Sequence, residues 1–129
     1  MSGANASPVG DPDGVGAAAF TIDFESATST QLCWDLSYSA ISPATQAHIH
    51  RGVAGQNGPP VVPDPVVATS LAPLDANSST GCQAISQALG TEIVTTPSNF
   101  YVDIHNAEYP GGAIRGQLTA GPPPAGEAH

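Results

Sequence analysis

Basic residues are nearly absent from this sequence of 129 residues, which has no lysine and only two arginines, Arg51 and Arg115. Eleven aspartates and glutamates leave a formal net charge of -9 at pH 7. A surface this acidic repels the phosphates of nucleic acids and the anionic headgroups of lipid membranes. We therefore expect no nucleic-acid partner, whereas the same charge would attract cations.

Long apolar runs are missing as well. A membrane-spanning helix needs about 20 consecutive apolar residues. No stretch of the sequence approaches that length, so we expect no membrane span. Residues 1–5 contain neither the basic stretch nor the apolar segment of a signal peptide. If the protein is exported, we expect the sequence to begin after the site of signal cleavage.

Aromatic residues make up only 5% of the chain, whereas glycine and proline are frequent, with 14 and 13 residues. This much glycine and proline disfavours long helices, and the absence of a triplet repeat excludes collagen. The chain is 40% apolar, which supports one cored domain, and it is too short for two. The composition therefore favours short strands joined by many turns.

Cysteine occurs only twice, at Cys33 and Cys82, and neither residue belongs to a CxxC motif. Both lie in strand-like surroundings. A bridge between them would close a loop of about 50 residues and stabilise the fold by roughly 4 kcal/mol in the chain-entropy model. We predict this disulfide and with it an oxidising compartment; the alternative is two buried free thiols in a cytosolic protein.

Alternating apolar and polar residues predict strands. The pattern is clearest in residues 16–24, where Phe20, Ile22 and Phe24 alternate with polar residues, and in residues 31–37. Further short strands are expected at 45–51, 81–85, 99–105 and 113–119. The stretch 61–74 is apolar but broken by three prolines, so it suits an edge strand or an extended loop.

One short helix is predicted over residues 86–94, because Ser86 can cap its N-terminus, Leu89 and Ile93 share a face, and Pro97 follows its end. Residues 1–15 are turn-rich and are expected to form an irregular lead-in, and residues 120–129 a disordered tail. About seven short strands within residues 16–119 predict an all-β domain, an antiparallel Greek-key-like β-sandwich.

Three of the four histidines lie in two of the predicted strands, and the fourth, His129, lies in the tail. Residues two apart on a strand point to the same face. His48 and His50 therefore share a face, and His105 shares one with Asp103 and Tyr101. If the intervening residues Ile49, Val102 and Ile104 face the core, the imidazoles form a polar patch on the outer surface of the sheet.

A His-x-His pair with a third imidazole from another strand predicts a metal site with His48, His50 and His105 as ligands. Imidazole suits copper and zinc, and Cu²⁺ has the higher intrinsic affinity, so copper is our first expectation and zinc the alternative. Asp103 or Tyr101 could orient a ligand from behind it, and Arg115 could hold an anion beside the metal. The competing interpretation is that these histidines hydrogen-bond to turns and bind nothing.

At these residues the sequence resembles the CHRD (chordin) domain family, bacterial secreted type. The motifs are AHIHRG (47–52) with GQNGP (55–59), and FYVDIH (100–105) with YPGGAIRGQL (109–118). The resemblance runs from about Ser2 to Leu118. It implies a β-sandwich and a secreted, periplasmic or cell-surface location, and it leaves the function open.

The His-x-His strand also resembles the copper-binding strand of Cu/Zn superoxide dismutase. His48 and His50 match the copper ligands of that strand, and His105 is a candidate for a further ligand. Apart from His129 in the tail, the chain has no further histidine for the bridging position or for a zinc site. Arg115 could imitate an anion-guiding arginine, although its spacing gives no firm equivalence.

Three functional hypotheses follow. The first is an extracytoplasmic protein that binds, stores or transfers copper. The second is a non-catalytic interaction module, in which the turn 52–60 and the last hairpin contact an extracellular protein and the histidines are structural. The third is a minimal copper superoxide dismutase, for which an acidic protein would have to build an anion-attracting site locally.

Overall fold

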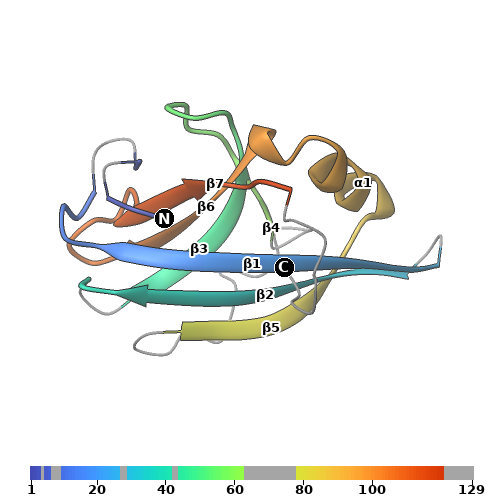
Figure 1. Ribbon diagram of the computed structural model, residues 1–129, viewed down its shortest axis with the longest axis horizontal. Coiled ribbons are helices and arrows are strands. Elements are labelled where there is room, and N and C mark those ends of the chain that lie inside the picture. The colour runs from blue at the N-terminus through green and yellow to red at the C-terminus, as the bar shows by residue number, and fades with distance from the viewer. Residues whose placement is uncertain (4, 7–9, 27–28, 42–43, 63–77, 121–129) are drawn as a thin grey trace.

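The computed structural model describes residues 1–3, 5–6, 10–26, 29–41, 44–62 and 78–120. Two antiparallel sheets pack against each other, so the predicted all-β sandwich is confirmed (Figure 1). The three-stranded sheet has the order β1-β2-β5 and consists of β1 (Val15–Ser26), β2 (Ser29–Ser39) and β5 (Ser78–Ile85). The four-stranded sheet has the order β4-β3-β6-β7 and consists of β4 (Pro60–Val62), β3 (Ala44–Arg51), β6 (Phe100–Asn106) and β7 (Ile114–Gln117).

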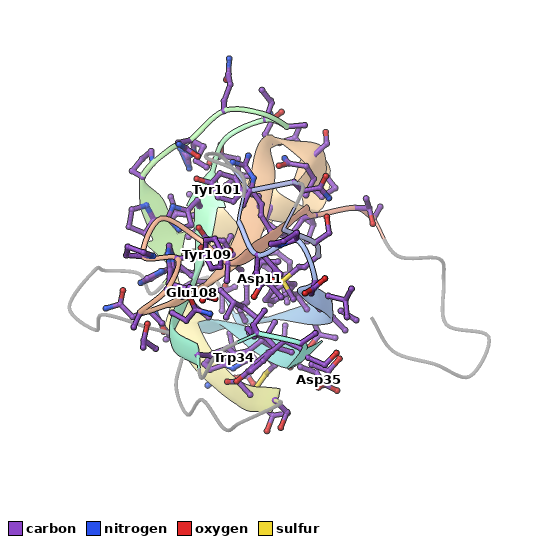
Figure 2. The ribbon with its side chains drawn as sticks, turned by 90° about the vertical axis from the view of Figure 1, so that its left-hand side faces the viewer. Asp11, Trp34, Asp35, Tyr101, Glu108 and Tyr109 are labelled. Carbon is purple, nitrogen blue, oxygen red and sulfur yellow. A yellow bond between two sulfur atoms is a disulfide. The ribbon has the colours of Figure 1, made fainter. Side chains whose placement is uncertain are left out.

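Strand β2 shows how alternation fixes the layers. Leu32, Trp34 and Leu36 are buried in the core between the sheets, and the residues between them face outward. The indole Nε1 of Trp34 donates to Ser79 Oγ at 3.0 Å, which satisfies its only donor in the core. Figure 2 separates the two layers, with Trp34 and Asp35 in one and Tyr101 in the other.

The predicted disulfide is confirmed. Cys33 on β2 lies directly opposite Cys82 on β5, and their sulfurs are bonded. Because Cys33 alternates with Leu32 and Trp34, the bridge lies on the outer face of the three-stranded sheet. It therefore ties β5, an edge strand, to the centre of its sheet.

The predicted helix is confirmed as α1 (Gln87–Thr95), and a 3₁₀ turn, η1 (Pro97–Asn99), follows it. Ser86 caps α1 by accepting a hydrogen bond from the Leu89 backbone N–H at 3.1 Å. Leu89 and Ile93 are buried against the core. No helix in the described residues is long and apolar enough to cross a membrane.

Several expectations concern segments at the margins of the domain. Of the stretch 61–74, residues 61–62 belong to the short edge strand β4 and the rest lies outside the described residues. In the lead-in, Ser2 forms isolated bridges to Val15 of β1 and Arg115 of β7, so it connects the two sheets at one end. The expected tail lies outside the described residues except for Ala120.

Candidate metal centre

The register of three strands brings the polar residues of this site together. β3 pairs antiparallel with β6, which places His48 opposite Asp103 and His50 opposite Tyr101. β6 pairs in turn with β7, which places Asp103 opposite Arg115. Directly opposed residues point to the same face of a sheet. These five side chains therefore share one face of the four-stranded sheet.

His105 joins the same face from the far end of β6, two residues after Asp103. The intervening residues Ile49, Val102 and Ile104 are buried on the opposite face, toward the core. The imidazole ring centroids are 5.5 Å apart for His48 and His50, 5.2 Å for His48 and His105, and 6.1 Å for His50 and His105. All three imidazoles thus lie on the outer side of the sheet.

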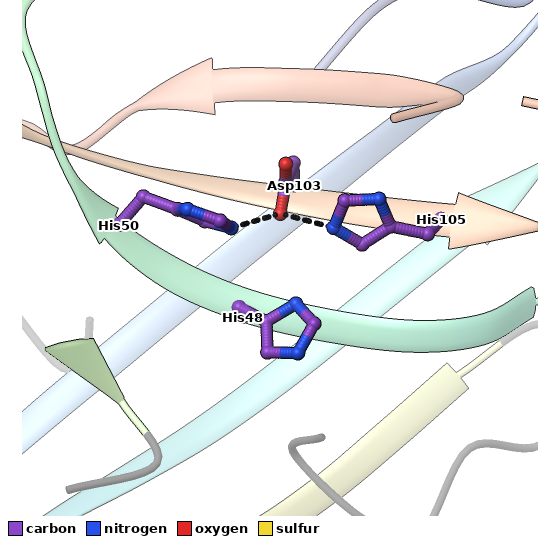
Figure 3. A group of neighbouring side chains, drawn as sticks. All are labelled: His48, His50, Asp103 and His105. Atoms are coloured by element: carbon purple, nitrogen blue, oxygen red, sulfur yellow. Dashed lines mark ion pairs between the residues drawn. The ribbon is translucent and has the colours of Figure 1, made fainter. Parts of the chain in front are cut away.

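The carboxylate of Asp103 lies between two of these rings (Figure 3). Its Oδ1 is 2.9 Å from Nε2 of His50 and 3.0 Å from Nε2 of His105. One ligand atom from each of His48, His50, Asp103 and His105 lies within 4.8 Å of the other three. Two ligands of one ion at metal–nitrogen lengths near 2.1 Å stand at most about 4.2 Å apart, so the widest pair must draw together slightly on binding.

The other ring nitrogens of His50 and His105 are fixed by backbone carbonyls. His50 Nδ1 lies 2.9 Å from the oxygen of Gly58, and His105 Nδ1 lies 3.0 Å from the oxygen of Pro110. A carbonyl oxygen only accepts hydrogen bonds, so this contact favours a proton on each Nδ1. The Asp103 carboxylate beside each Nε2 is also an acceptor, so both contacts of a ring are satisfied together when the imidazole is doubly protonated, or when Nδ1 carries the proton and a metal ion binds Nε2.

Without a proton on either Nε2, lone pairs face one another at the centre of the cluster. Nε2 of His50, Nε2 of His105 and Oδ1 of Asp103 are buried and have no partner among the described residues other than one another. Buried acceptors that converge without a donor are electrostatically unfavourable unless a cation lies between them. A proton or a metal ion can fill that role.

The pKa values at the site reflect the need for positive charge between these acceptors. Burial works to lower the pKa of His105, but the contacts with Asp103 and with the Pro110 carbonyl outweigh it, so the pKa of His105 lies above its ordinary value. Burial works to raise the pKa of Asp103, but the contacts with His105 and His50 outweigh it and hold the pKa below its ordinary value. The cluster therefore favours positive charge on the rings and negative charge on the carboxylate.

The site is much less open than the sequence led us to expect. The side chains of His50 and His105 are each 12% exposed, so the patch is not a solvent-facing surface. The difference arises from the loop of residues 52–59, which covers one end of the cluster. The Gly58 carbonyl reaches His50 from this loop, and Arg115, only 2% exposed, donates to the loop oxygens of Val53 and Gln56.

Asp103, Tyr101 and Arg115, which we expected around the ligands, occupy three different places. Asp103 lies among the candidate ligand atoms, and backbone carbonyls orient the rings. The Tyr101 ring stacks on the His50 ring, with centroids 4.8 Å apart and planes 3° apart. Arg115 lies beneath the loop instead of at an open mouth. The disulfide is on the outer face of the other sheet, away from this site.

Sequence reasoning missed the carbonyls of Gly58 and Pro110, because a backbone carbonyl has no residue signature. A partial signal does exist at Gly58. A Cβ there would lie 1.6 Å from the oxygen of Arg51, so only glycine allows the loop to approach the strand this closely. The second glycine of the GQNGP motif, Gly58, thus marks the place where the loop contacts β3.

These features define the class: a disulfide-linked antiparallel β-sandwich with a histidine–carboxylate cluster on one sheet that could hold a metal ion. The chain matches the CHRD domain over residues 1–118 and belongs to that family. No curated protein and no solved structure matches it. The resemblance of the His-x-His strand to Cu/Zn superoxide dismutase therefore rests on His48 and His50 alone.

Proposed function

We propose that this CHRD-domain protein binds one transition-metal ion, copper, outside the cytoplasm and stores it or hands it to another molecule. The ligands are His48, His50, His105 and Asp103. The observation that carries the proposal is the convergence of Nε2 of His50 and Nε2 of His105 on one carboxylate oxygen, while a backbone carbonyl lies against each Nδ1. With the proton on Nδ1, each Nε2 can give its lone pair to a metal ion beside that oxygen.

Copper is preferred because three imidazole nitrogens suit it and because Cu²⁺ binds a given nitrogen and oxygen site more tightly than Zn²⁺. The carboxylate oxygen is also an ordinary zinc ligand, so zinc is the competing ion. The disulfide and the family membership support an extracytoplasmic location, where disulfides persist.

The enclosure of the cluster favours storage or transfer of copper over redox turnover. Four candidate donor atoms gather within 4.8 Å, and His50, His105 and Asp103 are largely buried. A dismutase needs an open position and a field that attracts anions. Arg115, the residue that could have supplied such a field, directs Nη2 at loop carbonyls.

A metal titration tests the proposal. We expect Cu²⁺ to produce a visible d–d band at one equivalent and to raise the melting temperature, because an ion that binds only the folded state stabilises it. His50→Ala and Asp103→Asn should each weaken both signals strongly. Asp35→Asn, which removes an exposed carboxylate from the other sheet, is the matched control and should change neither.

The contrary result is also well defined. A wild-type protein that gives neither a band nor a change in melting temperature with Cu²⁺ or Zn²⁺ does not bind metal here, and an interaction module with structural histidines becomes the better hypothesis. Competition between the two ions at equal concentration identifies which of them the site prefers. If the copper-loaded protein consumes superoxide, the hypothesis of a dismutase replaces that of copper storage.

A further inference from the structure

Arg115 is a buried cation whose hydrogen bonds go to neutral oxygens within the described residues. Its Nη2 donates to the carbonyl oxygens of Val53 at 3.0 Å and Gln56 at 2.7 Å and to Gln117 Oε1 at 3.0 Å. Its Nη1 donates to Asn57 Oδ1 at 3.2 Å. Three of these four acceptors belong to the loop of residues 52–59. The guanidinium therefore holds that loop against the sheet.

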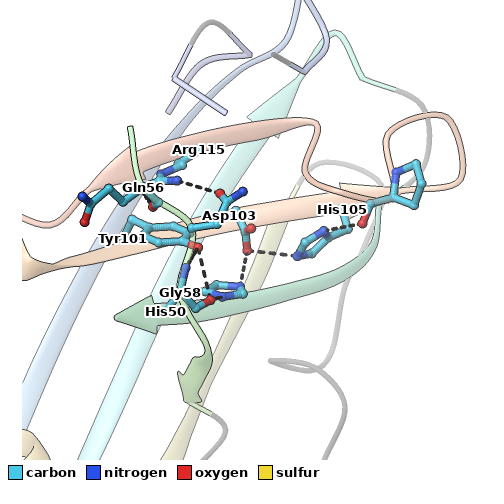
Figure 4. A network of polar contacts seen from close by, with 9 residues as sticks. His50, Gln56, Gly58, Tyr101, Asp103, His105 and Arg115 are labelled. Atoms are coloured by element: carbon cyan, nitrogen blue, oxygen red, sulfur yellow. Dashed lines mark hydrogen bonds and ion pairs between the residues drawn. The ribbon is translucent and has the colours of Figure 1, made fainter. Parts of the chain in front are cut away.

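The same guanidinium packs on the aromatic ring that supports His50. The Cζ of Arg115 lies 3.4 Å from the centroid of the Tyr101 ring, and Tyr101 lies between Arg115 and His50 (Figure 4). The Tyr101 hydroxyl accepts a hydrogen bond from the Gly58 N–H at 3.1 Å. Tyr101 thus contacts both His50 and the loop residue that touches His50.

A continuous set of contacts therefore runs from Arg115 to the imidazole of His50. Arg115 holds residues 53, 56 and 57, and the next residue, Gly58, places its carbonyl 2.9 Å from His50 Nδ1. That carbonyl favours the proton on Nδ1 of the neutral ring, in competition with the Asp103 carboxylate, which favours it on Nε2. If the loop moves away, the alternative tautomer becomes favourable, because an Nε2–H can donate to the carboxylate of Asp103 2.9 Å away.

We propose that Arg115 is a positioning residue that keeps His50 in the tautomer able to bind a metal, by holding the Gly58 carbonyl against Nδ1. The consequence for copper rests on the proposed function, but the tautomer itself does not depend on any metal. Arginine suits this role because its planar group can donate to several carbonyls while one face lies on an aromatic ring. A lysine ammonium lacks that shape.

His105 provides an internal control within the same molecule. Its Nδ1 contacts the Pro110 carbonyl in the β6–β7 connection, and no loop residue held by Arg115 takes part. Loss of the Arg115 contacts should therefore change the tautomer of His50 and leave that of His105 unchanged. A general loosening of the fold would affect both rings.

The test is ¹⁵N NMR of the two imidazoles at the alkaline plateau of their titration, where both rings are neutral. In the wild type we expect Nδ1–H on His50 and on His105. In Arg115→Lys we expect a substantial population of Nε2–H on His50 alone, together with copper binding that is weaker by about 10–100-fold. A folded Arg115→Lys protein whose His50 keeps Nδ1–H, or whose two rings change equally, would overturn the proposal.

A milder variant covers the case in which Arg115→Lys does not fold. Asn57→Ala removes one acceptor of Arg115 from an exposed loop position and leaves the core intact. It should shift His50 in the same direction by a smaller amount. Val53→Ala is its control, because the hydrogen bond from Arg115 ends on the backbone oxygen of Val53, which the substitution keeps. An unchanged His50 in Asn57→Ala, or an equal shift in both variants, contradicts the proposal. If the wild type binds no copper, the proposed function fails while the NMR result still decides the role of Arg115.

Discussion

Oδ1 of Asp103 lies 2.9 Å from Nε2 of His50, whose other nitrogen faces the carbonyl of Gly58. The same oxygen lies 3.0 Å from Nε2 of His105. One carboxylate oxygen thus meets two imidazole nitrogens that backbone carbonyls have turned toward it. Protons and metal ions compete for this centre.

Copper binding should weaken as the pH falls. A metal ligand must be a deprotonated imidazole nitrogen, and the pKa of His105 is raised above its ordinary value of 6.5. Protons therefore compete with copper already above pH 6.5 and increasingly below it. Copper affinity measured by competition with a chelator between pH 5 and pH 8 should rise with pH, with release of protons detected by calorimetry. An affinity that does not depend on pH would remove His105 from the ligand set.

The metal-free protein should be most strongly stabilised by His105 and Asp103 over a limited pH range. The raised pKa of His105 adds stability that is complete below pH 6.5 and is lost as the pH rises through the raised value. The lowered pKa of Asp103 adds stability that is complete above its ordinary value of 3.8 and is lost as the pH falls through the lowered value. Both contributions are present together between about pH 4 and pH 6.5.

Urea unfolding in the presence of a chelator measures this window. From pH 5.5 to pH 8.5 the free energy of unfolding should fall further in the wild type than in Asp103→Asn, in which the interaction is absent. Asp35→Asn is the matched control and should follow the wild type. If Asp103→Asn and the wild type show the same pH dependence, the carboxylate and the imidazoles are not coupled in solution.

Removing the disulfide should destabilise the fold without affecting the metal site. Cys33 and Cys82 lie 49 positions apart in the sequence, and the chain-entropy model assigns such a loop about 4 kcal/mol. Because the bridge lies on the outer face of the other sheet, the double variant Cys33→Ala/Cys82→Ala should unfold at lower urea concentration and bind copper with unchanged affinity at low temperature. A parallel loss of copper affinity would show that the two sheets are coupled.

Gly58→Ala should damage the metal site more than the fold. The added Cβ would lie 1.6 Å from the carbonyl oxygen of Arg51, so the loop must shift away from β3 and take the Gly58 carbonyl with it. We expect copper affinity to fall by about 10–100-fold, as for other residues that orient a ligand. Gly55→Ala is the control: its φ of +82° makes the substitution strained, but no atom lies within 4 Å of the new Cβ. Equal losses in both variants would point to general loop strain.

The layers and the faces of the fold could be predicted from the sequence because they depend on local alternation. Leu32, Trp34 and Leu36 are buried as their spacing indicates, and Ile49 between two histidines assigns the imidazoles to the outer side. The capped helix at Ser86 likewise depends on neighbouring residues only. Phe24 near the end of β1 is 41% exposed although it continues the alternation of Phe20 and Ile22, which pack against the core.

The enclosure of the site could not be predicted in the same way. It depends on where an irregular loop folds back and on which backbone oxygens it directs at Arg115 and His50. The contact of Arg115 with Gln56 joins residues 59 positions apart, the contact of His50 with Gly58 joins residues 8 apart, and no side-chain pattern encodes either of them. The spacing within β6 predicts that Asp103 shares a face with His105, but its contact with His50 depends on the register between β3 and β6, which that spacing does not give.

The pairing of Ser2 with Arg115 has a practical consequence for work on this protein. The backbone N–H of Ser2 donates to the Arg115 oxygen at 3.0 Å, and the Arg115 N–H donates back at 2.9 Å. The main chain of Arg115, the residue that holds the loop, is therefore itself held by Ser2. A purification tag joined directly ahead of Met1 adds bulk two positions from that pairing, so affinities should be compared between tagged and cleaved protein before they are assigned to the domain.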